Sequence, residues 1–338
     1  MPSTSGALSH GIRSVLETHN DPLRVLTSTA RVVQRAKFVT LNLKRVETVA
    51  QVLSLRPVPV PAWNYTYHYF DDTERTVIYI FLLDALNFSF WGEPKWSIRR
   101  VRQDLDGYWA LAAALKFAAE QDPSFLNAES LADISPAALA RVLRGNVEIP
   151  LFVERWRNVQ ELGRVLRDQF GGSAARLVDT AHQDATELAR LVAEYISSFH
   201  DTTQYQGHTV NFFKRAQILA GDLYGSFGGE RWGKFKNLQD LTAFADYKLP
   251  QILRAWGILH YAPSLARRVD QKIPLEKDSA EEIEIRAGML WGVELLRAAL
   301  AERGRVLTSI HMDWFLWESS QGAVKGMKPY HRVRTIYY

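Results

Sequence analysis

The sequence predicts a mainly α-helical fold with a few short β-strands. Three observations carry this prediction: apolar side chains recur at steps of three and four residues, helix-start signals are frequent, and alternating segments are scarce. The 338 residues are 47% hydrophobic and 23% charged, which is the balance of a folded protein. We expect one globular unit over 1–338, or two closely packed helical subdomains over about 1–200 and 201–338.

Helical periodicity is clearest over 151–170, where Phe152, Trp156, Val159, Leu162 and Leu166 mark one buried face. The same spacing recurs along most of the chain. In chain order, the expected helices span 28–37, 41–53, 107–119, 136–143, 151–170, 174–196, 210–223, 249–256, 279–304 and 309–317. Loops or hinges are expected at 171–172 and at the glycine-rich stretch 225–233.

Capping residues mark the start of two of these helices. Ser135 before Pro136 has the pattern of an N-cap followed by a proline at the first helical position. Ser279 and Glu282 have the spacing of a capping box, in which each side chain accepts a hydrogen bond from the backbone near the other. Strands are few: the segment 96–101 alternates, a turn is expected at 104–107, and the aromatic tail 335–338 either pairs or packs.

Composition excludes several classes of protein and site. The sequence has no cysteine, so disulfides, thiolate catalysis and cysteine-based zinc sites are excluded. The longest apolar run, 77–83, is far shorter than the roughly 20 residues of a membrane span. The first 24 residues lack the apolar core of a signal peptide. We therefore expect a cytoplasmic protein without a membrane partner.

Charge and motif content narrow the function further. The net charge is only +4, with basic spots at 99–102 and 331–334, which suits one small anion better than a long polynucleotide. No stable nucleic-acid partner is expected. The nine histidines show no metal-ligand spacing, and the stretch 225–233 lacks the fingerprints of phosphate-binding loops. No Gly-x-Ser-x-Gly elbow is present. We expect neither a metal nor an organic cofactor.

Two segments combine aromatic or charged side chains with an apolar setting. The segment 84–91 holds Asn87, Phe88 and Trp91, and it is either the end of a core helix or a wall on which a base stacks. Periodicity alone favours the core helix. The segment 212–219 holds Lys214 and Arg215 among apolar residues. These two side chains either meet a buried anion or lie at a solvated helix edge with a structural ion pair.

A third segment, 244–251, places Asp246 just before a proline that suits the first turn of a helix. Asp246 is therefore either a helix cap or a carboxylate presented at a helix start. Phe244 and Tyr247 flank it and offer aromatic faces for a ligand. The residues alone leave both interpretations open.

These three segments, with 282–286, 313–318 and 329–338, resemble the queuosine salvage protein family, the queuosine 5'-phosphate N-glycosidases. The resemblance runs from about Tyr79 to the end of the sequence. It implies a fold similar to that of the helix-hairpin-helix DNA glycosylases and a catalytic role for Asp246. It also implies that the base contacts Phe244 and three residues of one helix, namely Asp313, Trp314 and Glu318.

The implied reaction suits these side chains. Cleavage of an N-glycosidic bond builds positive charge on the ribose, and a carboxylate stabilises that charge and orients the attacking water. The base carries a cationic amine, for which Asp313 and Glu318 are natural partners, although five residues place them on different faces of a helix. Phe88 is a further stacking candidate. Lys214 and the arginines of the tail are candidates for the 5'-phosphate.

Two other functions remain open from the sequence. One is a base glycosylase that acts on DNA or RNA and flips its target base out of the helix. The other is a helical binding module without enzymatic activity, in which Asp246 is only a cap.

Overall fold

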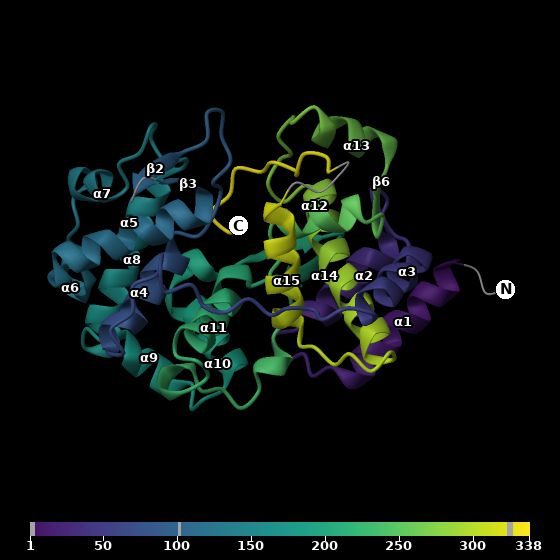
Figure 1. The fold of residues 1–338 in the computed structure, drawn as a ribbon, viewed down its shortest axis with the longest axis horizontal. Coiled ribbons are helices and arrows are strands. Elements are labelled where there is room, and N and C mark those ends of the chain that lie inside the picture. Colours follow the sequence, from purple (N-terminus) through teal and green to yellow (C-terminus); the bar gives the residue numbers. More distant parts are fainter. Residues whose placement is uncertain (1–3, 101–102, 323–326) are drawn as a thin grey trace. The chain divides into compact units, whose positions relative to one another are not determined.

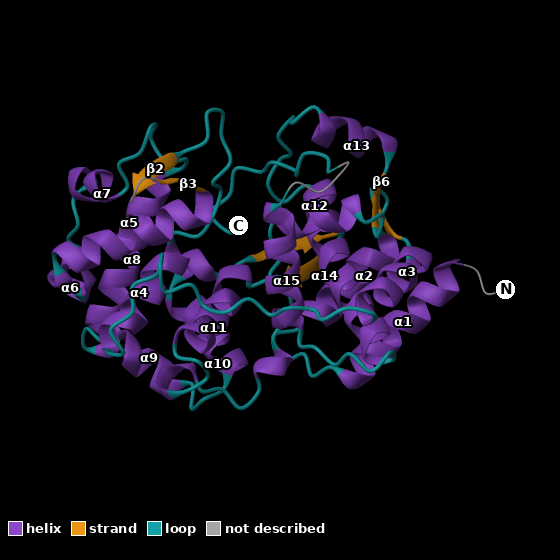
Figure 2. Cartoon of the chain, viewed as in Figure 1, coloured by secondary structure: helices purple, strands orange, loops and turns teal. Residues whose placement is uncertain are grey.

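The computed structural model describes residues 4–100, 103–322 and 327–338, and helices dominate it (Figures 1 and 2). The prediction of a mainly α-helical fold with a few short strands is confirmed. The chain divides into two compact units. The first unit holds 1–61, 202–214 and 237–334, and the second holds 62–201, 215–236 and 335–338. No helix in these described ranges has the length and apolar content that crossing a membrane requires.

The first unit is helical with two small antiparallel pairs of strands, β1 with β6 and β4 with β5. Its elements are α1 (Thr4–Thr18), α2 (Val25–Arg35), β1 (Val39–Leu41), α3 (Leu43–Ser54), β4 (Thr202–Tyr205), β5 (His208–Asn211), α12 (Lys248–Ala255), β6 (Leu259–Tyr261), α13 (Pro263–Asp270), α14 (Ala280–Ala301) and α15 (Ser309–Gln321).

The second unit is built on helices and on the antiparallel pair of β2 with β3. Its elements are α4 (Glu74–Ala85), β2 (Ser97–Arg100), β3 (Gln103–Asp106), α5 (Gly107–Gln121), α6 (Ala128–Ala132), α7 (Pro136–Val142), α8 (Phe152–Phe170), α9 (Ala174–Thr180), α10 (Ala185–Tyr195) and all but the first residue of α11 (Lys214–Ser226). Short 3-10 turns lie at Pro123–Leu126, Ser197–Phe199 and Arg231–Gly233.

Helix α14 forms the centre of the first unit. It packs against α1, α2, α3, α12, α15 and β1 (Figure 1). Its side chains are buried on all sides over most of its length. One buried carboxylate, Glu284, ties this helix to β1, because its Oε2 accepts hydrogen bonds from the backbone N–H of Phe38 at 2.6 Å and Val39 at 3.1 Å. Its Oε1 accepts from the hydroxyl of Tyr205 at 2.8 Å. The buried charge is thus fully hydrogen-bonded.

Helix α4 holds the corresponding place in the second unit, where it packs against α5, α8 and α9. The carbonyl groups at its C-terminal end have no partner within the helix, and two buried arginines satisfy them. Arg215 donates to the carbonyls of Asp84 at 2.9 Å and Ala85 at 2.8 Å, while Arg155 donates to the carbonyl of Leu86. Both positive charges also suit the negative end of the helix dipole.

Both predicted serine N-caps are confirmed, and the capping box is confirmed for one of its two hydrogen bonds. The hydroxyl of Ser135 accepts from the N–H of Ala138 at 3.1 Å, and that of Ser279 accepts from the N–H of Glu282 at 3.3 Å. The carboxylate of Glu282 reaches back to the N–H of Asp278 rather than to that of Ser279, so the capping box is shifted by one residue.

Three expected elements differ from the structure. The expected helix over 174–196 is two helices, α9 and α10, because His182 and Gln183 adopt left-handed φ values of 50° and 63°. The expected helix over 210–223 begins only at Lys214, since its first residues belong to β5. The turn expected at 104–107 is mostly strand β3, which pairs with β2.

The strand expected over 96–101 is confirmed as β2, with its last residue, Val101, outside the described residues. The tail 335–338 packs into the second unit. The N–H of Ser89 donates to the carbonyl of Tyr338 at 2.8 Å, and the Ser89 hydroxyl donates to the carbonyl of Thr335 at 2.7 Å.

Candidate active site

Asp246 caps the helix that follows it. It is 9% exposed, and its Oδ1 accepts hydrogen bonds from the backbone N–H of Lys248 at 2.9 Å and Leu249 at 2.8 Å. Lys248 and Leu249 are the first two residues of α12, and Tyr247 before them makes no side-chain cap, so the carboxylate of Asp246 satisfies the N–H groups at this helix start. Its second oxygen, Oδ2, accepts no hydrogen bond from the residues that the structure describes. The cap therefore occupies one carboxylate oxygen and leaves the other for a ligand.

Opposing effects act on the pKa of the Asp246 carboxyl. Burial raises the pKa of its carboxyl, whereas the N–H of Leu249 and the positive charge of Lys214 act to lower it, and burial prevails. A carboxyl with a raised pKa is a better proton acceptor when it is ionised. Such a balance between desolvation and a specific charged neighbour is typical of catalytic carboxylates.

Lys214 is the first residue of α11 and only 4% exposed. The residue before it, Phe213, has φ of 47°, in the left-handed region that bulky residues rarely adopt. Lys214 thus starts its helix directly after a sharp change of chain direction, and its positive charge acts to lower the pKa of Asp246. Arg215 beside it is buried as well, so the alternative of a solvated helix edge is wrong for both.

Asp313 of α15 holds the segment that carries Asp246. Its Oδ1 accepts a hydrogen bond of 2.7 Å from the backbone N–H of Phe244, and both residues are buried. Asp313 and Phe244, two of the predicted base contacts, therefore lie together. Phe244 is two residues before Asp246 in the sequence. A contact of Asp313 with the base stays a prediction.

The other predicted base contacts lie on partly open surface. Trp314 is half-buried and Glu318 is exposed, and four residues place them on one face of α15, apart from the buried Asp313. Tyr247 is half-buried, with its ring 4.9 Å from that of Tyr330. The three residues are available to a ligand, and their contact with one stays a prediction.

Phe88 is buried in the second unit, and the stacking role expected for it stays a prediction. Its ring is 1% exposed, and the guanidinium carbons of Arg155 and Arg215 lie over it at 4.2 and 5.2 Å from its centre. Phe88 is therefore part of the core of the second unit, because its segment is anchored to two buried arginines. Asn87, which follows α4 in the same unit, is also largely buried.

The basic spots have different surroundings. In the tail, Arg332 is half-buried and Arg334 is exposed, and their role toward a phosphate stays a prediction. Arg99 pairs with Asp104 at 3.8 Å on the surface, and the guanidinium of Arg100 lies 4.3 Å from the centre of the Phe117 ring. The third residue of that spot, Arg102, lies outside the described residues.

Sequence reasoning missed Arg286, a buried arginine of α14 whose Nε donates to the carbonyl of Ala245 at 3.2 Å. The available signal was a charge among the apolar side chains Ile283, Ile285 and Met289 of the same helix. Burial first, and then the charge of Arg286, lower the pKa of His331 to about 3, so this buried histidine is neutral at ordinary pH.

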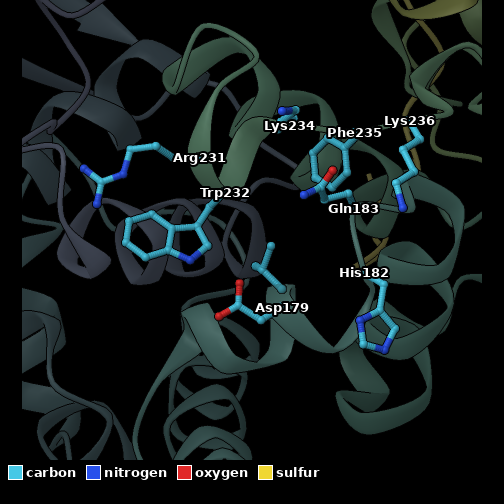
Figure 3. Close-up of a pocket in the computed structure, with 9 residues that line it drawn as sticks. Asp179, His182, Gln183, Arg231, Trp232, Lys234, Phe235 and Lys236 are labelled. Atoms are coloured by element: carbon cyan, nitrogen blue, oxygen red, sulfur yellow. The ribbon is translucent and has the colours of Figure 1, made fainter.

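A pocket of about 340 Å³ in the second unit is distinct from these residues (Figure 3). It is lined by Val178, Asp179, His182, Gln183, Arg231, Trp232, Lys234, Phe235 and Lys236. Its lysines are exposed, Arg231 pairs with Asp72 at 2.8 Å, and none of the predicted site residues lines it. Over the described residues, no three His, Asp or Glu side chains gather closely enough to hold a metal ion.

Comparison with known proteins identifies the relatives of this chain. Residues 67–338 match the family described as queuosine salvage protein. The chain is 46% identical to the queuosine 5'-phosphate N-glycosylase/hydrolase of Sphaerobacter thermophilus over 94% of this chain and 98% of that protein. Proteins of the same name from Bos taurus and Schizosaccharomyces pombe are 35% and 30% identical, over 78% and 91% of this chain and 82% and 100% of their own lengths.

Proposed function

Because this chain belongs to the queuosine salvage protein family, we propose that it hydrolyses the N-glycosidic bond of queuosine 5'-phosphate, with Asp246 at the reacting centre. Its products are queuine and ribose 5-phosphate. The observation that supports this role of Asp246 is that its two carboxylate oxygens differ. Oδ1 is fixed by two backbone N–H groups, and Oδ2 is left for the substrate. The likeness to helix-hairpin-helix DNA glycosylases stays a prediction.

The reaction breaks the bond between the ribose and the base and adds one water. The bonding electrons leave with the base, and the ribose becomes cation-like in the transition state. The ionised Asp246 stabilises this charge, orients the water and accepts one proton from it. That proton is passed on through solvent to the departing base, so Asp246 returns to its ionised form and one water is consumed. Since both anchors of Oδ1 are backbone groups of α12, the carboxylate is held in place before the charge develops, as electrostatic catalysis requires.

The remaining site residues have complementary tasks in this proposal. Asp313 and Glu318 bind the polar and cationic groups of the base, and Trp314, Phe244 and Tyr247 offer aromatic faces to its ring. Asn87 is a further contact. Lys214 binds the 5'-phosphate, together with arginines of the tail. Lys214 also favours the ionised form of Asp246, which is the form that the reaction needs.

The proposal includes a small-molecule substrate, no stable nucleic-acid partner and a cytoplasmic location. A glycosylase that tracks a polynucleotide is disfavoured by the net charge of +4. A binding module without activity is disfavoured because the named relatives are N-glycosylase/hydrolases.

Mass spectrometry of released queuine tests the proposal. The purified protein is incubated with queuosine 5'-phosphate and, in parallel, with an oligonucleotide that contains queuosine. Release from the nucleotide alone is expected. Release from the oligonucleotide alone supports the polynucleotide glycosylase, and no release from either substrate contradicts the proposed function.

A further inference from the structure

Arg286 has no task in the mechanism above, although it donates a hydrogen bond to the residue that precedes Asp246. It is a buried residue in the second turn of α14. Its guanidinium contacts two segments that are distant in sequence. The Nε donates to the carbonyl of Ala245 at 3.2 Å, and the guanidinium carbon lies 3.8 Å from the centre of the Phe212 ring. Ala245 directly precedes Asp246, and Phe212 lies two residues before Lys214.

The loop of Phe244, Ala245 and Asp246 is hydrogen-bonded to three helices, and each of the three residues bonds to a different helix. The N–H of Phe244 donates to Asp313 of α15, the carbonyl of Ala245 accepts from Arg286 of α14, and the carboxylate of Asp246 accepts from the backbone of α12. Each tie fixes a different polar group. The orientation of Oδ2 therefore depends on all three helices, and Arg286 supplies the tie to the central one.

We propose that Arg286 is a positioning residue. It holds the Asp246 loop and the segment before Lys214 at the relative positions that the reaction needs. The inference rests on the proposed function of Asp246. A guanidinium suits this task because its edge donates hydrogen bonds while its flat face packs on an aromatic ring. A lysine ammonium is a point charge without such a face, so it does not replace both contacts at once.

Arg286→Lys tests the inference, with Glu284→Gln as the matched control. Glu284 lies two residues away on α14, is equally buried and also ties the helix to backbone groups. Those groups belong to the first residue of β1 and to the residues before it, and not to the Asp246 loop. Arg286→Lys is expected to lower the single-turnover rate on queuosine 5'-phosphate by about 10- to 100-fold, as small misplacements of reacting groups do. KM and the affinity for queuine are expected to stay within about twofold of wild type, because only the reacting geometry changes.

The control variant distinguishes a specific positioning role of Arg286 from a general loss of α14 stability. Glu284→Gln is expected to melt at a lower temperature and to keep the wild-type rate. Equal rate losses in the two variants overturn the inference, as does a wild-type rate in folded Arg286→Lys, or a loss of affinity that equals its loss of rate. If Arg286→Lys does not fold, Phe212→Leu replaces it, since that change removes the ring under the guanidinium and is expected to slow turnover without weakening binding.

Asp246→Asn separates this inference from the proposed function. If Asp246→Asn turns over at the wild-type rate, the role of Asp246 fails and the inference fails with it. If Asp246→Asn is inactive and Arg286→Lys is as fast as wild type, only the inference about Arg286 fails.

Discussion

Replacing Asp246 by asparagine separates its two roles, because the structure assigns them to different properties of the side chain. The cap needs an oxygen that accepts from the N–H groups of Lys248 and Leu249, and the carbonyl oxygen of asparagine does so as well. The favourable interaction of a negative charge with the helix start is lost, typically about 0.3–1 kcal/mol, and the larger cost of burying that charge is removed with it. Catalysis needs the charge itself, and preorganised electrostatic groups are commonly worth about 10²-fold or more in rate.

The expected result is a folded variant that binds queuosine 5'-phosphate and turns it over at least about 100-fold more slowly. Single-turnover kinetics measures the rate, calorimetry the affinity, and thermal melting the stability. Asp184→Asn is the matched control, since Asp184 caps α10 by accepting from the N–H of Glu187 at 2.8 Å. It is expected to keep full turnover, because it removes the charge of a helix cap that has no part in the reaction. A near wild-type rate in Asp246→Asn would refute the mechanism and leave Asp246 as a cap alone.

The pH dependence gives the same prediction a second readout. Burial raises the pKa of Asp246 above its ordinary value of 3.8, so the folded protein binds this proton more tightly than the unfolded chain. The contribution of the protonated carboxyl to stability is therefore fully present below 3.8 and is lost as the pH rises through the raised value. The rate has the opposite dependence, because the ionised form is the active one. Both transitions are expected to disappear in Asp246→Asn.

Three further predictions concern the rest of the site. Lys214→Ala is expected to weaken binding of queuosine 5'-phosphate more than binding of the nucleoside, which calorimetry on both ligands measures; equal losses contradict a phosphate contact. Asp313→Asn keeps an acceptor for the N–H of Phe244 but removes the charge, and it is expected to lose about 1.5–3 kcal/mol of binding, as is Glu318→Ala; unchanged affinity in both variants removes them from the base site. Exhaustive chelation is expected to leave turnover intact, and activity that only added metal restores contradicts the expectation of a metal-free site.

The sequence predicts the fold well where local rules decide the structure. The apolar steps of α8, the N-cap of Ser135 and the capping pair at the start of α14 all follow from neighbouring residues, and the structure confirms them. Prediction from the sequence fails where the backbone conformation breaks a helix although the apolar spacing continues. The apolar spacing runs on through 181–184, yet His182 and Gln183 are left-handed and divide the helix.

The site divides in the same way. Asp246 is predictable as a cap or a catalytic group, because its place before a proline is visible in the sequence, and the structure shows the cap. The burial of Phe88 could not be predicted, because its covering arginines, Arg155 and Arg215, lie more than sixty residues from it in the chain. Arg286 was missed for the same reason, since its partners Ala245 and Phe212 become neighbours only in the folded protein.

The interleaving of the two units has a consequence for biosynthesis. Helices α2 and α3 end by residue 54, but α14, against which they pack, begins at residue 280. About 225 residues separate them, which at the usual translation rate of about 5–20 residues per second is a delay of roughly 10–45 s. During that time the apolar face of α2 has no native partner on α14 to cover it. The first unit therefore completes its core only after α14 has been synthesised. Contacts between segments so distant in sequence predict slow folding, and the exposed apolar face of α2 predicts a need for chaperones during translation.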